Sequence, residues 1–255
     1  MERPAIRLRG VGCTIDGRAL LKDIEWDIEP GSRWVVFGSN GCGKTTLLSI
    51  IAGYGSYSGS VKIGDAELNT MDELDWRTSI GFVSGSFFGR IYQNETVLSI
   101  LAAGARGTMG APLEEVTPQE MRAIRKLLAS RGLAHRLDSP FVTLSKGEQQ
   151  VVLVLRAMLL KTQTLLLDEP MSGLDVAARA EMQHMLFALA DKRQATMIYV
   201  SHHLEEISPE LFDNCLLLSR GRVQASGPIR EVLSSPAALR IIGDNPYAQK
   251  GADEQ

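Results

Sequence analysis

The chain has 255 residues, of which 44% are hydrophobic and 22% are charged. This length and composition suit one large domain with a buried core and argue against a disordered chain. The 27 Lys and Arg residues against 30 Asp and Glu residues give a net charge of -3 at pH 7. The overall charge therefore does not indicate binding to nucleic acid or capture by an anionic membrane surface.

Apolar runs and cysteine usage indicate the cellular compartment of the protein. The longest nearly apolar run, residues 151–160, contains Arg156 and has only about half of the roughly twenty residues that a membrane span requires. The three cysteines, Cys13, Cys42 and Cys215, have no spacing typical of a disulfide framework. No signal-peptide pattern opens the sequence, so we expect a reduced, cytoplasmic protein that does not cross the bilayer.

In chain order, the first elements predict strands around a glycine-rich loop. Apolar and acidic residues alternate at 24–28, as in a half-exposed strand, and a buried strand follows at 34–37. The glycine-rich turn at 38–43 leads into an apolar stripe that suits a buried helix. Further short apolar runs predict strands at 80–83, 165–167, 197–200 and 216–218. The spacing of these runs indicates an α/β fold with a largely parallel sheet.

The middle and the end of the chain differ from this pattern. Helical spacing at 95–103 and again from Met121 to Leu128, with a glycine-rich loop at 104–111 between them, predicts a helical subdomain inserted at about 87–160. We expect one domain over residues 1–235 and a polar tail over 236–255, of which about the last dozen residues fray.

The glycine-rich loop matches the phosphate-binding pattern G-x-x-x-x-G-K-[ST]. Its glycines let successive backbone N–H groups turn toward phosphate oxygens, and the N-terminus of the next helix adds partial positive charge. We expect Lys44 to reach the β- and γ-phosphates and the Thr45 hydroxyl to bind Mg²⁺, which prefers oxygen ligands. The residues predicted to hold the nucleotide here are Gly38, Ser39, Asn40, Gly41, Cys42, Gly43, Lys44, Thr45 and Thr46.

Two adjacent carboxylates, Asp168 and Glu169, follow the predicted strand at 165–167. The carboxyl ends of strands are where open α/β sheets bind ligands. Asp168 suits the role of holding Mg²⁺, through water, and Glu169 can polarise the attacking water as general base. Together with a phosphate-binding loop, this pair predicts a nucleotide hydrolase.

Three further motifs, in order along the chain, give the sequence a resemblance to the ATP-binding cassette ATPases. Residues 144–148 read L-S-K-G-E, which is similar to the L-S-G-G-Q signature of that family, residues 172–175 read S-G-L-D like its D-loop, and His202 follows a predicted strand as its switch histidine does. The resemblance covers nearly the whole chain. It implies a P-loop fold with a mixed α/β core, an antiparallel β region near the N-terminus and a helical subdomain that ends in the signature helix.

The resemblance also implies a mechanism and partners. ATP is hydrolysed with Mg²⁺ in a head-to-tail homodimer, with each ATP between Lys44 of one chain and Ser145 and Gly147 of the other. His202 contacts the γ-phosphate and positions the water with Glu169. The D-loop Asp175 links the two sites. A separate transmembrane subunit, with this chain peripheral on the inner face of the cell membrane, is the leading expectation.

Two functions other than transport stay open at this point. A soluble ATPase in DNA repair or regulation is favoured by Gly85, where the family has a magnesium-binding glutamine, and by Glu148 in place of the last signature glutamine. A regulatory module with negligible turnover is the third alternative, and the intact Glu169 and His202 argue against it. Gln93 is a candidate to replace the missing glutamine, although an ordinary polar loop residue is the simpler interpretation.

Other departures from the family pattern affect single residues. Ile15 stands where the family has an aromatic residue that stacks on adenine, so we expect apolar packing and weak discrimination of the base. Lys146 replaces a signature glycine. Glu148 can also be a first-turn acid that favours the helix dipole. A helix N-terminus lowers a thiol pKa, but for Cys42 we favour a small filler whose backbone N–H binds phosphate.

Overall fold

The computed structural model describes residues 5–108, 115–160 and 162–242. Two compact units are present, one from residues 1–71 and 196–255 and one from residues 72–195, and each is described by itself. The fraying expected for the last dozen residues concerns positions outside the described part. The second unit contains the whole of the expected helical insertion at about 87–160.

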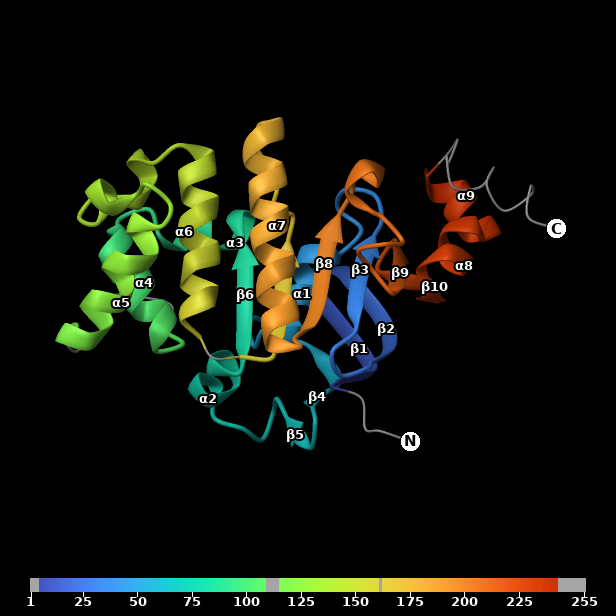
Figure 1. The fold of residues 1–255 in the computed structure, drawn as a ribbon. Helices are drawn as coiled ribbons and strands as arrows, with labels where there is room; N and C mark the ends of the chain where they lie inside the picture. The colour runs from blue at the N-terminus through green and yellow to red at the C-terminus, as the bar shows by residue number, and fades with distance from the viewer. Residues whose placement is uncertain (1–4, 109–114, 161, 243–255) are drawn as a thin grey trace. The chain divides into compact units, whose positions relative to one another are not determined.

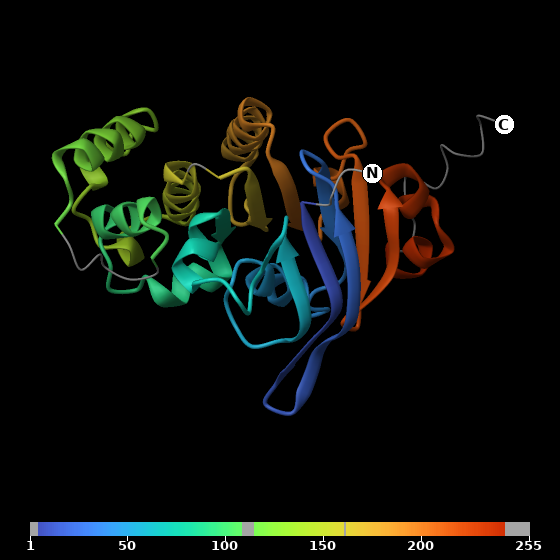
Figure 2. The same cartoon turned by 90° about the horizontal axis from the view of Figure 1, so that it is seen from below.

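The first unit contains an antiparallel sheet of strand order β2-β1-β4-β5. Its strands are β1 (Ile6–Ile15), β2 (Arg18–Ile28), β4 (Ser58–Ile63) and β5 (Ala66–Glu67). The strands β1 and β2 form a long hairpin, drawn in blue in Figure 2, with Ile6 opposite Ile28 and Ile15 opposite Arg18. Side chains alternate between the two faces of a strand, which is why buried Ile6 and Leu8 flank the half-buried Arg7.

A second, mostly parallel sheet includes four strands of this unit. These strands are β3 (Arg33–Phe37), β8 (Thr196–Ser201), β9 (Asn214–Ser219) and β10 (Arg222–Pro228). The strand β3 pairs in parallel with both β8 and β9, and β10 closes the edge antiparallel to β9. Residues 34–37 and 196–201 are all buried, as expected for strands covered on both faces.

Helices α1 (Lys44–Ile51), α8 (Ile229–Ser234) and α9 (Pro236–Ile242) complete the described part of the first unit. The strand, loop and helix predicted around residues 34–51 are therefore confirmed. The helix α9 lies in the segment that we expected to be a polar tail, and Ala238 within it is fully buried.

The second unit combines a parallel strand pair with a group of helices (Figure 1). The strands are β6 (Ile80–Ser84) and β7 (Thr164–Asp168), in a register that sets Ser84 opposite Asp168. The helices are α2 (Glu73–Thr78), α3 (Gly85–Ile91), α4 (Val97–Ala105), α5 (Pro118–Ala129), α6 (Lys146–Leu159) and α7 (Val176–Arg193), with short 3₁₀ turns at Ala134–Arg136 and Phe141–Thr143.

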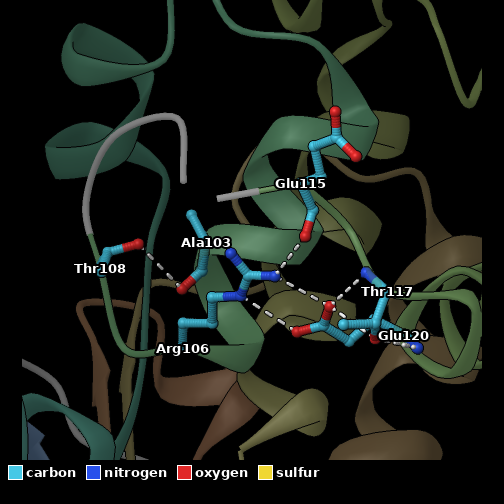
Figure 3. A network of polar contacts seen from close by, with 6 residues as sticks. All are labelled: Ala103, Arg106, Thr108, Glu115, Thr117 and Glu120. Carbon is cyan, nitrogen blue, oxygen red and sulfur yellow. Dashed lines mark hydrogen bonds and ion pairs between the residues drawn. The ribbon is translucent and has the colours of Figure 1, made fainter. Parts of the chain in front are cut away.

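Polar contacts tie α4 to α5 (Figure 3). The Arg106 guanidinium follows α4 and donates to both carboxylate oxygens of Glu120, at 3.0 and 2.9 Å. Glu120 also accepts from the backbone N–H of Thr117 at 2.8 Å, and the Thr117 hydroxyl accepts from the Glu120 N–H, which forms a capping box at the start of α5. These bonds hold the pKa of Glu120 down at about 2, chiefly through Arg106.

A buried arginine joins α6 to α3. The Arg156 side chain is 2% exposed, and its guanidinium carbon lies 4.5 Å from the centre of the Phe88 ring. Its Nη2 donates to the Thr108 carbonyl at 3.0 Å. Stacking of this kind stabilises a weakly hydrated guanidinium inside the protein.

Candidate functional site

The loop between β3 and α1 is shaped to receive an anion. Gly41 and Gly43 have φ values of 74° and 112°, which residues with a Cβ rarely adopt. At Gly43 a Cβ would also lie 2.8 Å from Leu21 Cδ2, so only glycine fits. Lys44 is 5% exposed, and its Nζ donates to the carbonyls of Gly38 and Ser39 at 2.7 and 3.1 Å. The lysine ammonium is thus held at the loop by oxygens that phosphate oxygens can replace.

A cavity of about 380 Å³ adjoins this loop within the first unit. Residues 39–42 of the loop form part of its wall. Three cationic residues, Arg18, Lys22 and Arg220, line it as well. Their positive charge favours an anionic ligand such as a nucleotide.

Ile15 stands at the end of β1, directly opposite Arg18 in the hairpin. Its side chain is 51% exposed, an unusual position for an isoleucine. Arg18 lines the cavity beside the phosphate loop. The structure therefore leaves Ile15 available for apolar contact with a base, without an aromatic ring.

Cys42 lies beside a helix N-terminus, but burial has the larger effect on the pKa of its thiol. Cys42 is 4% exposed, and burial raises the pKa of its thiol, with the nearby Lys44 only partly opposing that shift. Desolvation of the thiolate outweighs the favourable charge because the sulfur faces the protein interior. The buried side chain therefore fills space within the loop, as favoured from the sequence, while the Cys42 N–H donates to the Ser39 carbonyl at 3.3 Å.

His202 follows β8 in the first unit, in a turn held by Glu206. The Glu206 carboxylate accepts from the hydroxyls of Tyr199 at 2.9 Å and Ser201 at 2.8 Å. The Ser201 hydroxyl in turn accepts from the backbone N–H of His203 at 3.0 Å. The rings of His202 and His203 lie with centroids 4.0 Å apart. This network fixes the backbone on both sides of His202.

Asp168 is the last residue of β7 in the second unit, and Glu169 follows it directly. Asp168 is 2% exposed, and its Oδ2 accepts from the Ser84 hydroxyl at 2.7 Å. Glu169 has a φ of 47°, a left-handed conformation that is strained for a residue with a side chain. Its carbonyl accepts from the Ser172 N–H at 3.0 Å, which turns the chain sharply after the strand. Strain at such a place is typical of a functional residue held by its surroundings.

The structure explains Glu148 by a local role in the signature. Ser145 caps α6, with its hydroxyl accepting from the Glu148 N–H at 3.2 Å, while the Glu148 carboxylate accepts from the Ser145 N–H at 2.8 Å and from Arg136 Nε at 2.9 Å. The pKa of Glu148 is lowered, first by the Ser145 N–H and then by Arg136. This capping box favours the interpretation of Glu148 as a first-turn acid.

The signature and the D-loop lie together within the second unit. Asp175 caps α7, accepting from the Ala178 N–H at 2.9 Å. Leu174 beside it is 9% exposed, and a Cβ on Gly147 would lie 3.3 Å from its Cδ2. Gly147 thus leaves room for the D-loop to pack against the start of α6.

The predicted site residues divide between the two units. The phosphate loop, Ile15 and His202 belong to the first unit. Asp168, Glu169, Ser145, Gly147 and Asp175 belong to the second. Among the described residues, no cluster of three or more His, Cys, Asp or Glu side chains forms a metal cage. The expected ligands are the Thr45 hydroxyl and the Asp168 carboxylate. These oxygen donors suit Mg²⁺, which usually takes one or two protein ligands together with substrate phosphates and water.

Sequence reasoning missed the residues on either side of Gly85, the position where the resemblance leads us to expect a glutamine. Ser84 and Ser86 flank Gly85, and both hydroxyls lie within hydrogen-bond distance of Asp168. Gln93, by contrast, is exposed in the turn after the seven-residue α3, so about 10 Å of helix separates it from Ser84. The parallel ends of the strands at 80–83 and 165–167 were the signal that could have placed Ser84 beside Asp168.

Comparisons with known proteins agree on one family. The ABC transporter family model matches residues 21–172. An uncharacterized ABC transporter ATP-binding protein of Bacillus subtilis is 37% identical over 90% of this chain and 87% of its own length. A putative ABC transporter ATP-binding protein of Streptococcus mutans is 32% identical, covering 94% of this chain and 92% of its own. A spermidine/putrescine import ATP-binding protein of Vibrio cholerae is 30% identical over 95% of this chain and 63% of its own length.

Solved structures show the same fold. CbiO1 of Clostridium perfringens, part of the ABC transporter complex CbiONQ, aligns over 100% of both chains with a TM-score of 0.71 and 23% identity. A dimeric ATP-binding cassette in a post-hydrolysis state, bound to ADP and phosphate, aligns over 89% of this chain and 99% of its own with a TM-score of 0.72 and 21% identity. The expected fold class is confirmed. No helix in the described ranges has both the length and the apolar character needed to span a membrane.

Proposed function

Because the chain belongs to the ABC transporter family, we propose that it forms a head-to-tail homodimer that closes on ATP and thereby drives a separate transmembrane subunit. Its activity is the hydrolysis of ATP to ADP and phosphate. The observation that carries the proposal is the phosphate loop, where the buried Lys44 Nζ is held by two backbone carbonyls at the start of α1. Replacement of these neutral carbonyls by phosphate oxygens is favourable, because the ammonium then bonds to oxygens that carry negative charge.

The roles of the individual groups follow from their chemistry. Thr45 and Asp168 supply the hard oxygen ligands that suit Mg²⁺, which when bound neutralises charge on the phosphates. Glu169 is the general base for the attacking water, and its half-buried carboxylate sits on a backbone that cannot relax freely. His202, held from both sides by the network around Glu206, contacts the γ-phosphate.

The signature gives the second half of each nucleotide site. Ser145 and Lys146 are exposed at the start of the 14-residue helix α6, so a phosphate carried by another chain can reach them. The helix dipole and the free N–H groups of the first turn attract that phosphate. Gly147 leaves the approach open, and Asp175 at the neighbouring D-loop links the two sites across the dimer.

The membrane-associated function is favoured over the soluble alternative. Three relatives that cover more than 85% of both chains carry names of ABC transporter ATP-binding proteins. Glu148, one of the two features that favoured a role in DNA repair or regulation, has a local role in capping α6. We place the chain in the cytoplasm, peripheral on the membrane through its transmembrane partner.

Trapping of the closed dimer tests the proposal. Glu169→Gln removes the general base and keeps the phosphate loop, so Mg-ATP should convert this variant from monomer to dimer in gel filtration. Adding Lys44→Ala to Glu169→Gln should abolish the shift. A Glu169→Gln protein that stays monomeric at millimolar Mg-ATP would contradict the sandwich.

Subunit mixing tests the head-to-tail arrangement. A chain with Lys44→Ala lacks the phosphate-loop half of both sites, and a chain with Ser145→Arg lacks the signature half, so neither variant alone can assemble an intact site. In their mixed dimer, the phosphate loop of the Ser145→Arg chain meets the signature of the Lys44→Ala chain, which restores one site. ATPase activity should therefore return on mixing. If the mixture stays as inactive as the separate variants, both halves of the site belong to one chain.

A further inference from the structure

Two serine hydroxyls converge on the Asp168 carboxylate. The Ser84 hydroxyl donates to Asp168 Oδ2 at 2.7 Å, and the Ser86 hydroxyl lies 3.4 Å from the same oxygen. The two hydroxyl oxygens are 3.2 Å apart. Ser84 is fully buried whereas Ser86 is exposed, so one hydroxyl is fixed in the core and the other faces solvent.

The bonding of Ser84 leaves it little freedom. Its hydroxyl has a single proton, which goes to Asp168, and its lone pairs accept from the Phe87 N–H at 3.3 Å at the start of α3. The strand register that sets Ser84 opposite Asp168 fixes the donor and the acceptor on neighbouring backbones. Oδ2 thus accepts from a hydroxyl whose place is set by the strand pairing, and this bond orients the Asp168 carboxylate.

We propose that Ser84 and Ser86 act as positioning residues for Asp168 and replace the glutamine that is missing at Gly85 in setting the affinity for Mg²⁺. This inference rests on the proposed function, since it assumes that Asp168 is a magnesium ligand. Hydrogen bonds from neighbouring groups orient metal-binding carboxylates, and their loss typically lowers metal affinity by about 10- to 100-fold. A short bond from a buried hydroxyl to a carboxylate is of this strong kind.

The other groups near this position do not fill that role. Gly85 has no side chain, and Gln93 lies beyond α3 in an exposed turn. Gln150 of α6 is 4% exposed, and its Oε1 faces Gly85. Ser84 and Ser86, by contrast, both bring a hydroxyl to Asp168 Oδ2.

Metal binding tests the inference apart from turnover. We would titrate Mn²⁺, as a paramagnetic substitute for Mg²⁺, into the full chain with ATP and follow bound metal by electron paramagnetic resonance. Ser84→Ala/Ser86→Ala should weaken Mn²⁺ binding by about 10-fold or more. ATP affinity in EDTA, measured by calorimetry, should stay at the wild-type value because the phosphate loop is intact. Ser86→Thr, which keeps the hydroxyl, should restore the affinity that Ser86→Ala loses.

A matched control separates positioning from general destabilisation. Ser99 donates to the Glu95 carboxylate at 2.6 Å in the same unit, and Ser99→Ala should leave Mn²⁺ binding unchanged. Because Ser84 is buried, the single variant Ser86→Ala serves as the test if the double variant misfolds. Wild-type Mn²⁺ affinity in Ser86→Ala and in the folded double variant would overturn this inference and leave the proposed function unaffected. Absence of metal-dependent ATP binding in the wild-type protein would overturn the proposed function with it.

Discussion

Gln150 directs its side-chain oxygen at the α-carbon of Gly85, so that a Cβ on Gly85 would lie 3.1 Å from Gln150 Oε1. That distance is shorter than ordinary van der Waals contact. The Gln150 Nε2 is buried with no hydrogen-bond partner among the residues that the structure describes. The space beside Gly85 is therefore occupied by the Gln150 side chain of α6, and any side chain at position 85 would have to displace it.

Substitution of Gly85 should expose this crowding. Gly85→Ala is expected to lower the free energy of unfolding by about 1 kcal/mol, because the new methyl group presses on a buried amide. In a Gln150→Ala background, Gly85→Ala should lower the free energy of unfolding by much less. A double-mutant cycle by urea denaturation measures the coupling between the two positions.

Gly89 provides the control in the same helix. A Cβ there meets nothing within 4 Å, and the residue has no left-handed backbone, so Gly89→Ala should stabilise the protein by about 0.5–1 kcal/mol. Equal effects of Gly85→Ala and Gly89→Ala would show that Gln150 yields without cost.

A second prediction concerns pH and the contacts between α4 and α5 (Figure 3). The pKa of Glu120 is lowered from 4.5 to about 2, first by Arg106. Because the folded pKa is depressed, the stabilisation is complete above the ordinary pKa and is lost as pH falls from about 4.5 toward 2. Glu120→Gln should thus lower the free energy of unfolding by about 1–2 kcal/mol at pH 7. This figure allows for the partial exposure of the ion pair, which weakens it. Below pH 4.5 the difference from wild type should become progressively smaller.

Calorimetric melting of Glu120→Gln and wild type at a series of pH values checks this difference. Glu73→Gln is the control, since Glu73 is 75% exposed and its pair with Arg77 is an i,i+4 contact worth only a few tenths of a kcal/mol. A Glu120→Gln deficit that stays constant down to pH 3 would contradict the assigned ion pair.

The three cysteines should be poorly reactive in the native protein. All three are buried, and burial raises the pKa of each thiol, that of Cys215 to about 12. Because the thiolate is the nucleophile, maleimide labelling at pH 7 should be slow and should accelerate as pH rises. Urea-unfolded protein should label rapidly at every cysteine. Fast native labelling of Cys42 at pH 7, identified by peptide mass analysis, would show that the phosphate loop opens readily.

The chemistry-bearing residues were more predictable from sequence than their surroundings. Lys44, Asp168 and Ser145 lie in short motifs whose local structure is set by glycine conformation, a buried strand and a helix cap. Such features depend on residues next to each other in sequence. The strand, loop and helix around residues 34–51 therefore formed as predicted.

What the sequence did not reveal depends on contacts between distant segments. The pairing of Ser84 with Asp168 spans 84 positions, and the approach of Gln150 to Gly85 requires α6 to pack beside α3. The pKa of the Cys42 thiol is a similar case, since the helix N-terminus is visible in the sequence and the degree of burial is not. Burial raises this pKa because desolvation of the thiolate outweighs the favourable charge nearby.

The last prediction concerns recognition of the base. Ile15 is 51% exposed at the end of β1, opposite Arg18, which lines the cavity beside the phosphate loop. Stacking of a base on an aromatic side chain is worth about 1–3 kcal/mol, so Ile15→Trp should raise ATP affinity by about tenfold. Calorimetric titration should show no such gain for tripolyphosphate, which has no base. Leu239→Trp, at another exposed apolar position of the same unit, should leave both affinities unchanged. An equal gain for ATP and tripolyphosphate would mean that the tryptophan acts on the phosphate loop, and no gain for either ligand would remove Ile15 from the nucleotide site.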